Sequence, residues 1–136
     1  MFRKIDDSIS VAPQITTAQI AEAAKLGFTL VINNRPEGEE PGQPSGADIA
    51  AAAQAAGLGY VAIPITHAGF SEAQVAAMAD ALGGANGPVL AFCRSGTRST
   101  LVWALAQGRN GADFATLAEK AAAAGYDLGP IRPLFG

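Results

Sequence analysis

The residues of this sequence best suited to chemistry stand together in one short segment, 93–99, which reads C-R-S-G-T-R-S. Cys93 is the only cysteine of the chain, and Arg94 and Arg98 are the two cations of the segment. An ionised thiol is a nucleophile, and guanidinium groups bind anions that carry several oxygens. The segment therefore predicts covalent catalysis on an anionic substrate, with Cys93 and Arg98 as catalytic residues.

The position of this segment strengthens the prediction. It follows an apolar run at 89–92, which we expect to be a strand, and precedes a helical pattern that starts at Ser99. A loop between a strand and a helix can curl so that its backbone N–H groups point inward, and the helix adds its positive N-terminal end. We expect Ser99 or Thr100 to cap the helix, Gly96 to allow the turn, and Cys93 to be a thiolate at neutral pH. The anion-binding residues are then Arg94, Ser95, Gly96, Thr97 and Ser99.

The alternative is that Cys93 is a small buried apolar residue, as isolated cysteines next to strands usually are. The two arginines argue against this interpretation, because a buried strand end gains nothing from unpaired cations. The arginines should also differ in role. Arg98 stands where the loop returns to the helix and can reach back over Cys93, whereas Arg94 is free to point outward or to pair with a carboxylate.

The elements that position the loop alternate between strands and helices along the chain. Apolar and β-branched runs predict strands at 8–12, 28–32, 60–64 and 89–92. Helices are predicted by the capping pairs Thr16/Gln19, Ser45/Asp48 and Ser71/Gln74, with ends near Gly27, Gly57 and Gly83, and by the patterns at 99–106 and 113–124. This order predicts an α/β fold in one domain, 1–136, with a mostly parallel central sheet and helices on both faces.

In such a fold the carboxyl ends of the strands gather the ligand site, which selects segments 33–44, 65–70 and 93–99. Asn33, Asn34 and Arg35 follow the second predicted strand and could bind substrate, although ordinary turn chemistry explains them equally well. His67 is either a titratable group of the site or an exposed loop histidine. Glu37, Glu39 and Glu40 are most simply interpreted as a solvated charge run, and Trp103, Leu101 and Leu105 as core residues.

Composition limits the classes of partner. The chain has 136 residues, 49% of them hydrophobic, and a net charge of −3, so a nucleic-acid partner is not expected. One cysteine and one histidine provide no cluster of zinc ligands, and no metal or cofactor is expected. The N-terminal residues turn acidic where a signal peptide would be apolar, and no apolar run reaches a membrane-spanning length. These features predict a soluble, cytoplasmic protein without membrane contact.

The spacing Cys-x4-Arg of the loop resembles the active-site loop of rhodanese-type sulfurtransferases, whose cysteine carries a persulfide. It is also similar to the Cys-x5-Arg-Ser/Thr loop of cysteine phosphatases, but it is one residue shorter. Over residues 3–110, the chain resembles the phosphatase-like domain of the β-lactamase-hydrolase-like proteins, which occurs alone or fused to metallo-β-lactamase-fold persulfide dioxygenases. The segments that carry this resemblance are I-S-V-A-P-Q-I-T, V-I-N-N-R-P-E-G-E-E-P-G-Q-P-S and V-L-A-F-C-R-S-G-T-R-S-T. The resemblance implies a tyrosine-phosphatase-like fold.

Two departures from the phosphatase pattern bear on the reaction. Ser99 stands where that pattern has its arginine, and the segment after Ile65 lacks the aspartate that usually serves as general acid, leaving His67 as a substitute. Sulfur transfer needs no obligatory acid. We therefore expect a sulfurtransferase that forms a persulfide on Cys93, taking sulfane sulfur from a small anion and passing it to an acceptor thiol, with a persulfide dioxygenase as a partner. The alternatives are a cysteine phosphatase acting on phosphate esters and a non-catalytic anion-binding module.

Overall fold

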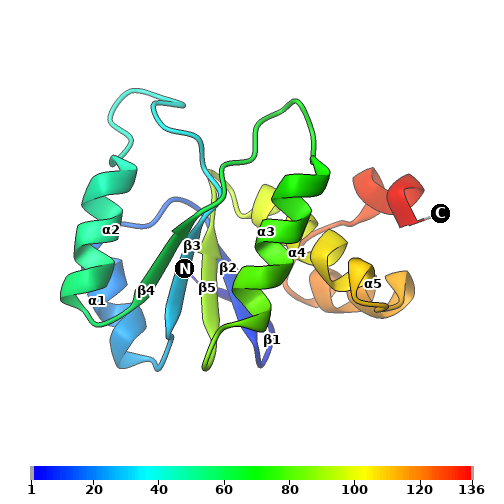
Figure 1. Ribbon diagram of the computed structural model, residues 1–136, viewed down its shortest axis with the longest axis horizontal. Coiled ribbons are helices and arrows are strands. Elements are labelled where there is room, and N and C mark those ends of the chain that lie inside the picture. Colours follow the sequence, from blue (N-terminus) through cyan, green and yellow to red (C-terminus); the bar gives the residue numbers. More distant parts are fainter. Residues whose placement is uncertain (1, 136) are drawn as a thin grey trace.

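Five strands form one sheet in the order β1-β2-β5-β3-β4 in the computed structural model, which describes residues 2–135 (Figure 1). The strands are β1 (Arg3–Asp6), β2 (Ile9–Ala12), β3 (Leu30–Asn33), β4 (Gly59–Ala62) and β5 (Val89–Phe92). Only β1 runs antiparallel to its neighbour, and the other pairs are parallel. The predicted α/β fold with a mostly parallel sheet is confirmed.

The register of the three inner strands brings their carboxyl ends to one edge. Phe92 of β5 is paired with Ala12 of β2 and with Asn33 of β3. The ladder continues by one residue on both sides, because the Cys93 N–H donates to the Ala12 carbonyl (3.3 Å) and the Asn34 N–H donates to the Phe92 carbonyl (2.8 Å). The loops that follow β3 and β4, cyan and green in Figure 1, rise from this same edge. The sheet therefore places segment 93–99 beside the loop after β3.

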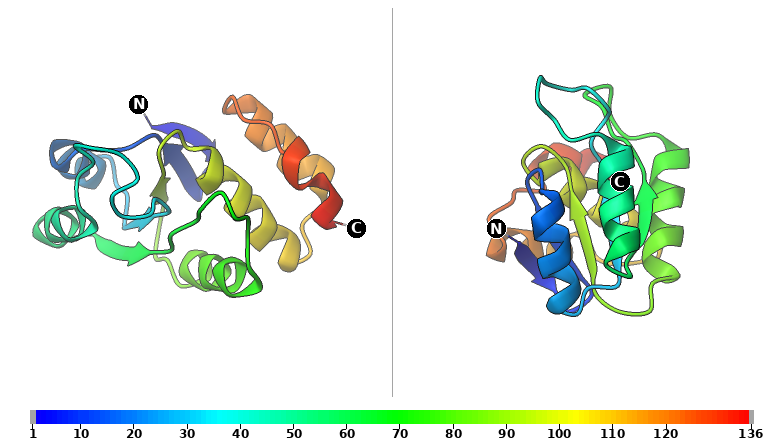
Figure 2. Two further views of the ribbon diagram at one scale, coloured as in Figure 1. Left: turned by 90° about the horizontal axis from the view of Figure 1, so that it is seen from above. Right: turned by 90° about the vertical axis from the view of Figure 1, so that its left-hand side faces the viewer.

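Helices cover both faces of the sheet, as the alternating pattern predicts (Figures 1 and 2). On one face, α1 (Thr17–Lys25) and α2 (Gly46–Ala55) pack over side chains such as Val31 and Leu90. On the other face lie α3 (Glu72–Gly83), α4 (Thr97–Arg109) and α5 (Phe114–Ala123). A 3-10 helix, η1 (Gly129–Phe135), ends the described chain. Within residues 2–135, no helix has both the length and the apolarity needed to cross a bilayer.

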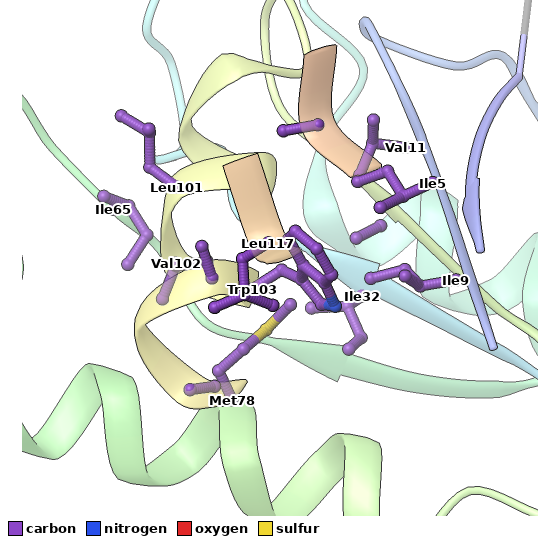
Figure 3. Close-up of a cluster of buried hydrophobic side chains, with 14 of the residues drawn as sticks. Ile5, Ile9, Val11, Ile32, Ile65, Met78, Leu101, Val102, Trp103 and Leu117 are labelled. Atoms are coloured by element: carbon purple, nitrogen blue, oxygen red, sulfur yellow. The ribbon is translucent and has the colours of Figure 1, made fainter. Parts of the chain in front are cut away.

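The larger core cluster is centred on α4. Trp103 is fully buried there and lies among Met78, Ile32 and Leu117, as Figure 3 shows. Leu101 is buried and Leu105 is partly buried in the same cluster, so the prediction that these helical residues belong to the core is confirmed. Because α4 starts where the cysteine loop ends, this core fixes the helix that the loop leads into.

Local signals predicted most element starts correctly. Thr16/Gln19 and Ser71/Gln74 both form complete capping boxes. At α2 only half of the box forms, because the Ser45 side chain accepts from the Asp48 N–H and Asp48 lacks the length to reach back.

Several element boundaries differ from the prediction by one to two residues. The strands expected at 28–32 and 60–64 are Leu30–Asn33 and Gly59–Ala62, and α4 begins before Ser99, at Thr97. Strand β1 was not predicted, because R-K-I-D holds a single apolar residue, as suits an edge strand. The helix η1 was also missed, since its two prolines indicate a loop.

Candidate active site

The sulfur of Cys93 lies at the base of a tight loop. Cys93 follows β5 directly and is fully buried, and its Sγ accepts a hydrogen bond from the Gly96 N–H at 3.1 Å. Gly96 has φ +91°, in the left-handed region that favours glycine, so the chain reverses and turns this amide toward the sulfur. The turn therefore directs a backbone N–H at the sulfur, as in loops whose amides face a bound anion.

Helix α4 begins at Thr97, immediately after this turn, and so presents its positive end next to the sulfur. The predicted capping by Ser99 or Thr100 is wrong. The N-cap is Gly96, which has no side chain to offer; the Thr100 hydroxyl donates to the Gly96 carbonyl at 2.9 Å. Ser99 is buried and donates to Asn34 Oδ1 at 2.8 Å. Both hydroxyls thus face the protein interior within the first helical turn and cannot serve the helix end.

The outer part of the loop is polar and exposed. Ser95 Oγ donates to Thr97 Oγ1 at 3.0 Å, and both residues are exposed. The Arg94 side chain is 61% exposed and pairs with Glu40 at 3.2 Å. Its pairing with a carboxylate agrees with one of the two orientations expected from the sequence. These three side chains are therefore accessible to an anion that approaches the loop from solvent.

Arg98 is held differently. Its Nη1 donates to the Ile65 carbonyl at 2.6 Å and its Nη2 donates to Glu39 Oε1 at 2.8 Å, and only 13% of its side chain is exposed. Arg98 thus joins the cysteine loop to the loops that follow β3 and β4. The expectation that Arg98 reaches back over Cys93 is not met, because its Nη1 and Nη2 donate to a carbonyl and a carboxylate of the neighbouring loops.

The interpretation of Glu37, Glu39 and Glu40 as a solvated run is wrong for Glu39, although Glu37 is exposed. Glu39 is 16% exposed, and its Oε1 accepts from Arg98 and, at 2.9 Å, from Arg35 Nε. The hydrogen bond from Arg98, followed by that from Arg35, lowers the pKa of Glu39 to about 2, although burial acts in the opposite direction. Glu37 accepts from the Gly46 N–H at the start of α2. Each of these glutamates therefore has a hydrogen-bond or ion-pair partner within the protein.

Arg35, Arg94, Arg98, Glu39 and Glu40 form what we call the arginine–glutamate cluster. Glu40 links its ends, because one carboxylate oxygen lies 2.9 Å from Arg35 Nη2 and the other 3.2 Å from Arg94 Nη2. Sequence reasoning missed Glu39 and Glu40 as site residues. The sequence offered one signal for this pair, the i, i+4 spacing of Arg35 and Glu39. Glu39 neutralises Arg35, which is buried in the structure.

Asn34 and Arg35 lie at the site, but their side chains form hydrogen bonds with other groups of the protein. Asn34 Nδ2 donates to the Ile63 carbonyl at 3.0 Å while its Oδ1 holds Ser99, and the 1% exposed Arg35 also donates to Gln14 Oε1 at 3.1 Å. Turn chemistry is present as well, since Asn33 Oδ1 accepts from the Arg35 N–H. It does not use a left-handed backbone, because no non-glycine residue between 2 and 135 has a positive φ. These side chains fix the loops around Cys93.

His67 lies in a turn between Thr66 and Gly69, on the loop after β4. It is exposed, as expected of a loop histidine. Among residues 2–135, no three His, Cys, Asp or Glu side chains come together in a way that could hold a metal ion.

Tyr126 is a further residue at the loop that sequence reasoning did not find. Its hydroxyl donates to the Ser95 carbonyl at 3.1 Å. It follows α5, and no motif in the sequence connects it with segment 93–99.

Comparison with known proteins agrees with this arrangement. Residues 1–112 match the family model described as "Beta-lactamase hydrolase-like protein, phosphatase-like domain". The chain is 36% identical over 108 residues to a beta-lactamase hydrolase-like protein of Agrobacterium fabrum, an alignment that covers 79% of this chain and 25% of that protein. The chain thus spans about a quarter of the length of the curated relatives it matches.

Solved structures share the fold. A protein of Neisseria meningitidis described as a "putative phosphatase" is 34% identical and has a TM-score of 0.85, covering 98% of this chain and 94% of that chain. A kinase associated phosphatase, solved with its catalytic site cysteine substituted by serine, is 14% identical with a TM-score of 0.69, covering 88% and 79%. With a cysteine loop of this geometry on a tyrosine-phosphatase-like fold, and with the family model matched over residues 1–112, the chain belongs to the family of the phosphatase-like domain of beta-lactamase hydrolase-like proteins.

Proposed function

We propose that this protein is a cysteine-dependent phosphatase in which Cys93 forms a covalent phosphocysteine intermediate. One observation carries the proposal: the buried Cys93 Sγ accepts a hydrogen bond from the Gly96 N–H at the point where the loop enters α4. This geometry favours a thiolate and offers a site for an anion next to it. The phosphatase descriptions of the relatives support the same reaction class.

The reaction proceeds in two displacements. The Cys93 thiolate attacks phosphorus, so that an S–P bond forms while the bond to the leaving oxygen breaks, and the leaving group departs as an alkoxide or phenoxide that takes up a proton. Water then attacks the phosphocysteine, releasing inorganic phosphate and the thiolate. Backbone N–H groups of the loop and the exposed Arg94 stabilise the charge on the phosphoryl oxygens.

The arginine–glutamate cluster moderates the positive potential of the site. Its three arginines face two glutamates, so one positive charge remains unbalanced within the cluster. Arg98 acts in this proposal by holding three loops in register, because its Nη1 donates to the Ile65 carbonyl and its Nη2 donates to Glu39. Arg94 is the arginine that can exchange its surface contact with Glu40 for a contact with substrate.

Protonation of the leaving group is the step of this reaction that requires a general acid. His67 is the titratable side chain of the loop after β4, and it is exposed. A phosphatase whose acid is solvent or an exposed histidine works best on aryl esters, whose leaving groups need little protonation. We therefore propose activated aryl phosphates as the preferred substrates.

Sulfur transfer is the second candidate, and a specific observation favours it. Ser99 occupies the position at which the longer phosphatase loop has its arginine, and it is buried against Asn34. In this reaction the Cys93 thiolate attacks the outer sulfur of thiosulfate, an S–S bond forms, and sulfite leaves as a stable anion without an acid. An acceptor thiolate then takes the sulfane sulfur and restores Cys93. A persulfide dioxygenase is the partner we propose as consumer of the acceptor persulfide.

One experiment separates the two candidates. The same preparation, with Cys93→Ser as control, is given p-nitrophenyl phosphate in one arm and thiosulfate in the other. A phosphatase releases p-nitrophenol and keeps its mass with thiosulfate, whereas a sulfurtransferase gains about 32 Da that a thiol removes. Phosphate release that is unchanged in Cys93→Ser, together with no mass gain, contradicts both candidates.

A further inference from the structure

One peptide group connects the sulfur of Cys93 with a residue outside the matched family region. The peptide that joins Ser95 to Gly96 donates its N–H to Cys93 Sγ at 3.1 Å and accepts at its carbonyl from the Tyr126 hydroxyl at 3.1 Å. A trans peptide is planar, and its N–H and C=O point in opposite directions. The Tyr126 hydroxyl and the Cys93 sulfur therefore hydrogen-bond to opposite sides of the same planar peptide group.

We propose that Tyr126 is a positioning residue for the Cys93 nucleophile and acts through the Ser95–Gly96 peptide group. This inference rests on the proposed function only in taking Cys93 as the nucleophile. The Tyr126 hydroxyl fixes the orientation of the peptide plane, so that the N–H stays directed at the sulfur. It also polarises the amide, because a hydrogen bond accepted at the carbonyl strengthens the bond that the N–H donates.

The surroundings of Tyr126 keep its hydroxyl in place. The Arg3 guanidinium lies over the Tyr126 ring, 5.4 Å from its centroid, and is itself bound to the Ala124 carbonyl at 3.3 Å. The Tyr126 N–H donates to the Ala121 carbonyl at 2.9 Å, which ties the residue to the end of α5. The hydroxyl is packed so closely against the turn that a Cβ on Gly96 would overlap it. Edge strand, C-terminal helix and cysteine loop thus meet at one side chain.

The protonation of Tyr126 suits this role. Burial raises its pKa, and the negative charge of Cys93 raises it further, while Arg3 acts in the opposite direction. The phenol therefore keeps its proton at neutral pH and remains a donor. Tyr126 lies beyond residue 112, where the family match ends, so segment 113–135 contributes to the nucleophile as well as to the core.

The test compares Tyr126→Phe with Tyr60→Phe, which removes the only other tyrosine hydroxyl of the chain. The Tyr60 hydroxyl also makes one hydrogen bond, from Asn33 Nδ2 at 3.0 Å, but not to the Ser95–Gly96 peptide. Cys93 is the single thiol, so iodoacetamide alkylation across pH reports on it alone. We expect the alkylation midpoint to move to higher pH in Tyr126→Phe and to stay in place in Tyr60→Phe. Equal midpoints in wild type and Tyr126→Phe, with melting curves that show both folded, overturn the inference.

A second measurement needs no change at Tyr126. In the Tyr60→Phe background, ultraviolet absorbance follows the ionisation of Tyr126 alone, and Cys93→Ser should lower its pKa because the thiolate charge is gone. An unchanged Tyr126 titration contradicts the inference even where Tyr126→Phe fails to fold. Neither measurement uses a substrate, so wild-type protein that turns over no phosphate ester would refute the proposed function and leave this inference standing.

Discussion

Arg98 and Glu39 determine how the cysteine loop is joined to its neighbours. The pair buries most of both side chains, and Arg35 shares the same carboxylate oxygen. Removing one partner of such a group leaves a poorly solvated charge, which costs more than an exposed ion pair contributes.

Glu39→Gln is therefore expected to lower the free energy of unfolding by about 1–3 kcal/mol, since Arg35 and Arg98 both lose a charged acceptor. Glu40→Gln is the matched control and should cost less, because Glu40 is more exposed. Urea denaturation measures both changes. Equal costs for the two variants would contradict the assignment of Glu39 as the central acceptor.

The same pair predicts a dependence on pH. The pKa of Glu39 is about 2 in the folded protein against 4.5 ordinarily, so its contribution to stability is fully present above 4.5 and is lost as the pH falls toward 2. Wild type should therefore lose more stability than Glu39→Gln over this range in urea titrations at stepped pH. Parallel losses would show that Glu39 titrates normally.

The two arginines of the loop should respond differently to truncation. Arg98→Ala frees the Ile65 carbonyl and one Glu39 contact, so we expect losses of both stability and kcat. Arg94→Ala removes an exposed contact, and its stability should stay within about 0.5 kcal/mol of wild type while KM rises. Steady-state kinetics and melting curves on both variants test this prediction. A kcat and stability of Arg98→Ala equal to those of Arg94→Ala would contradict it.

At the scale of elements, the site depends on how β5 passes into α4. The strand places Cys93 at the sheet edge, Gly96 reverses the chain with φ +91°, and the helix starts at the next residue. The reversal leaves no room for a side chain, because Tyr126 packs against it.

Gly96→Ala should therefore destabilise the protein by more than about 1 kcal/mol and slow the alkylation of Cys93, since the left-handed backbone disfavours alanine and the new Cβ displaces the Tyr126 hydroxyl. Gly83→Ala provides the control. Gly83 is the last residue of α3, has open space around its Cβ position, and should tolerate alanine without loss. If both variants melt and alkylate like wild type, the close packing at Gly96 is refuted.

At the scale of the whole molecule, the region matched by the family model is not the whole core. Leu117 of α5 and Leu128 and Ile131 beyond it are buried in the cluster around Trp103, and α5 packs against α4 and β1. Each such side chain contributes about 1.5–3 kcal/mol when fully buried.

A chain truncated after Ala112 is thus expected to lose cooperative unfolding and to expose apolar surface, because it lacks four buried core residues, Leu117, Ala121, Leu128 and Ile131, and also Tyr126. Calorimetry and binding of a hydrophobic dye compare it with the full chain. A truncated chain with an unchanged melting temperature would contradict the role assigned to segment 113–135.

The sequence by itself determined the order of the elements from β2 to α5 and the place of the nucleophile, although it did not indicate β1 or η1. Capping at Thr16 and Ser71, the apolar run at 89–92 and the C-R-S-G-T-R-S segment are local patterns, and local backbone preferences act within a few residues. The alternation of these elements then predicts parallel pairing and places the loop at the carboxyl edge of the sheet, as observed.

Only the tertiary structure decided which side chains surround that loop. Glu39 is predicted to face solvent, but in the structure it accepts from both Arg35 and Arg98. Tyr126, which follows α5, donates to the Ser95 carbonyl. Such partners are far apart along the chain, and their contacts depend on how helices and loops pack in three dimensions. A one-dimensional pattern reports the type and the spacing of residues, whereas burial and a specific hydrogen-bond partner exist only once distant segments have been brought together.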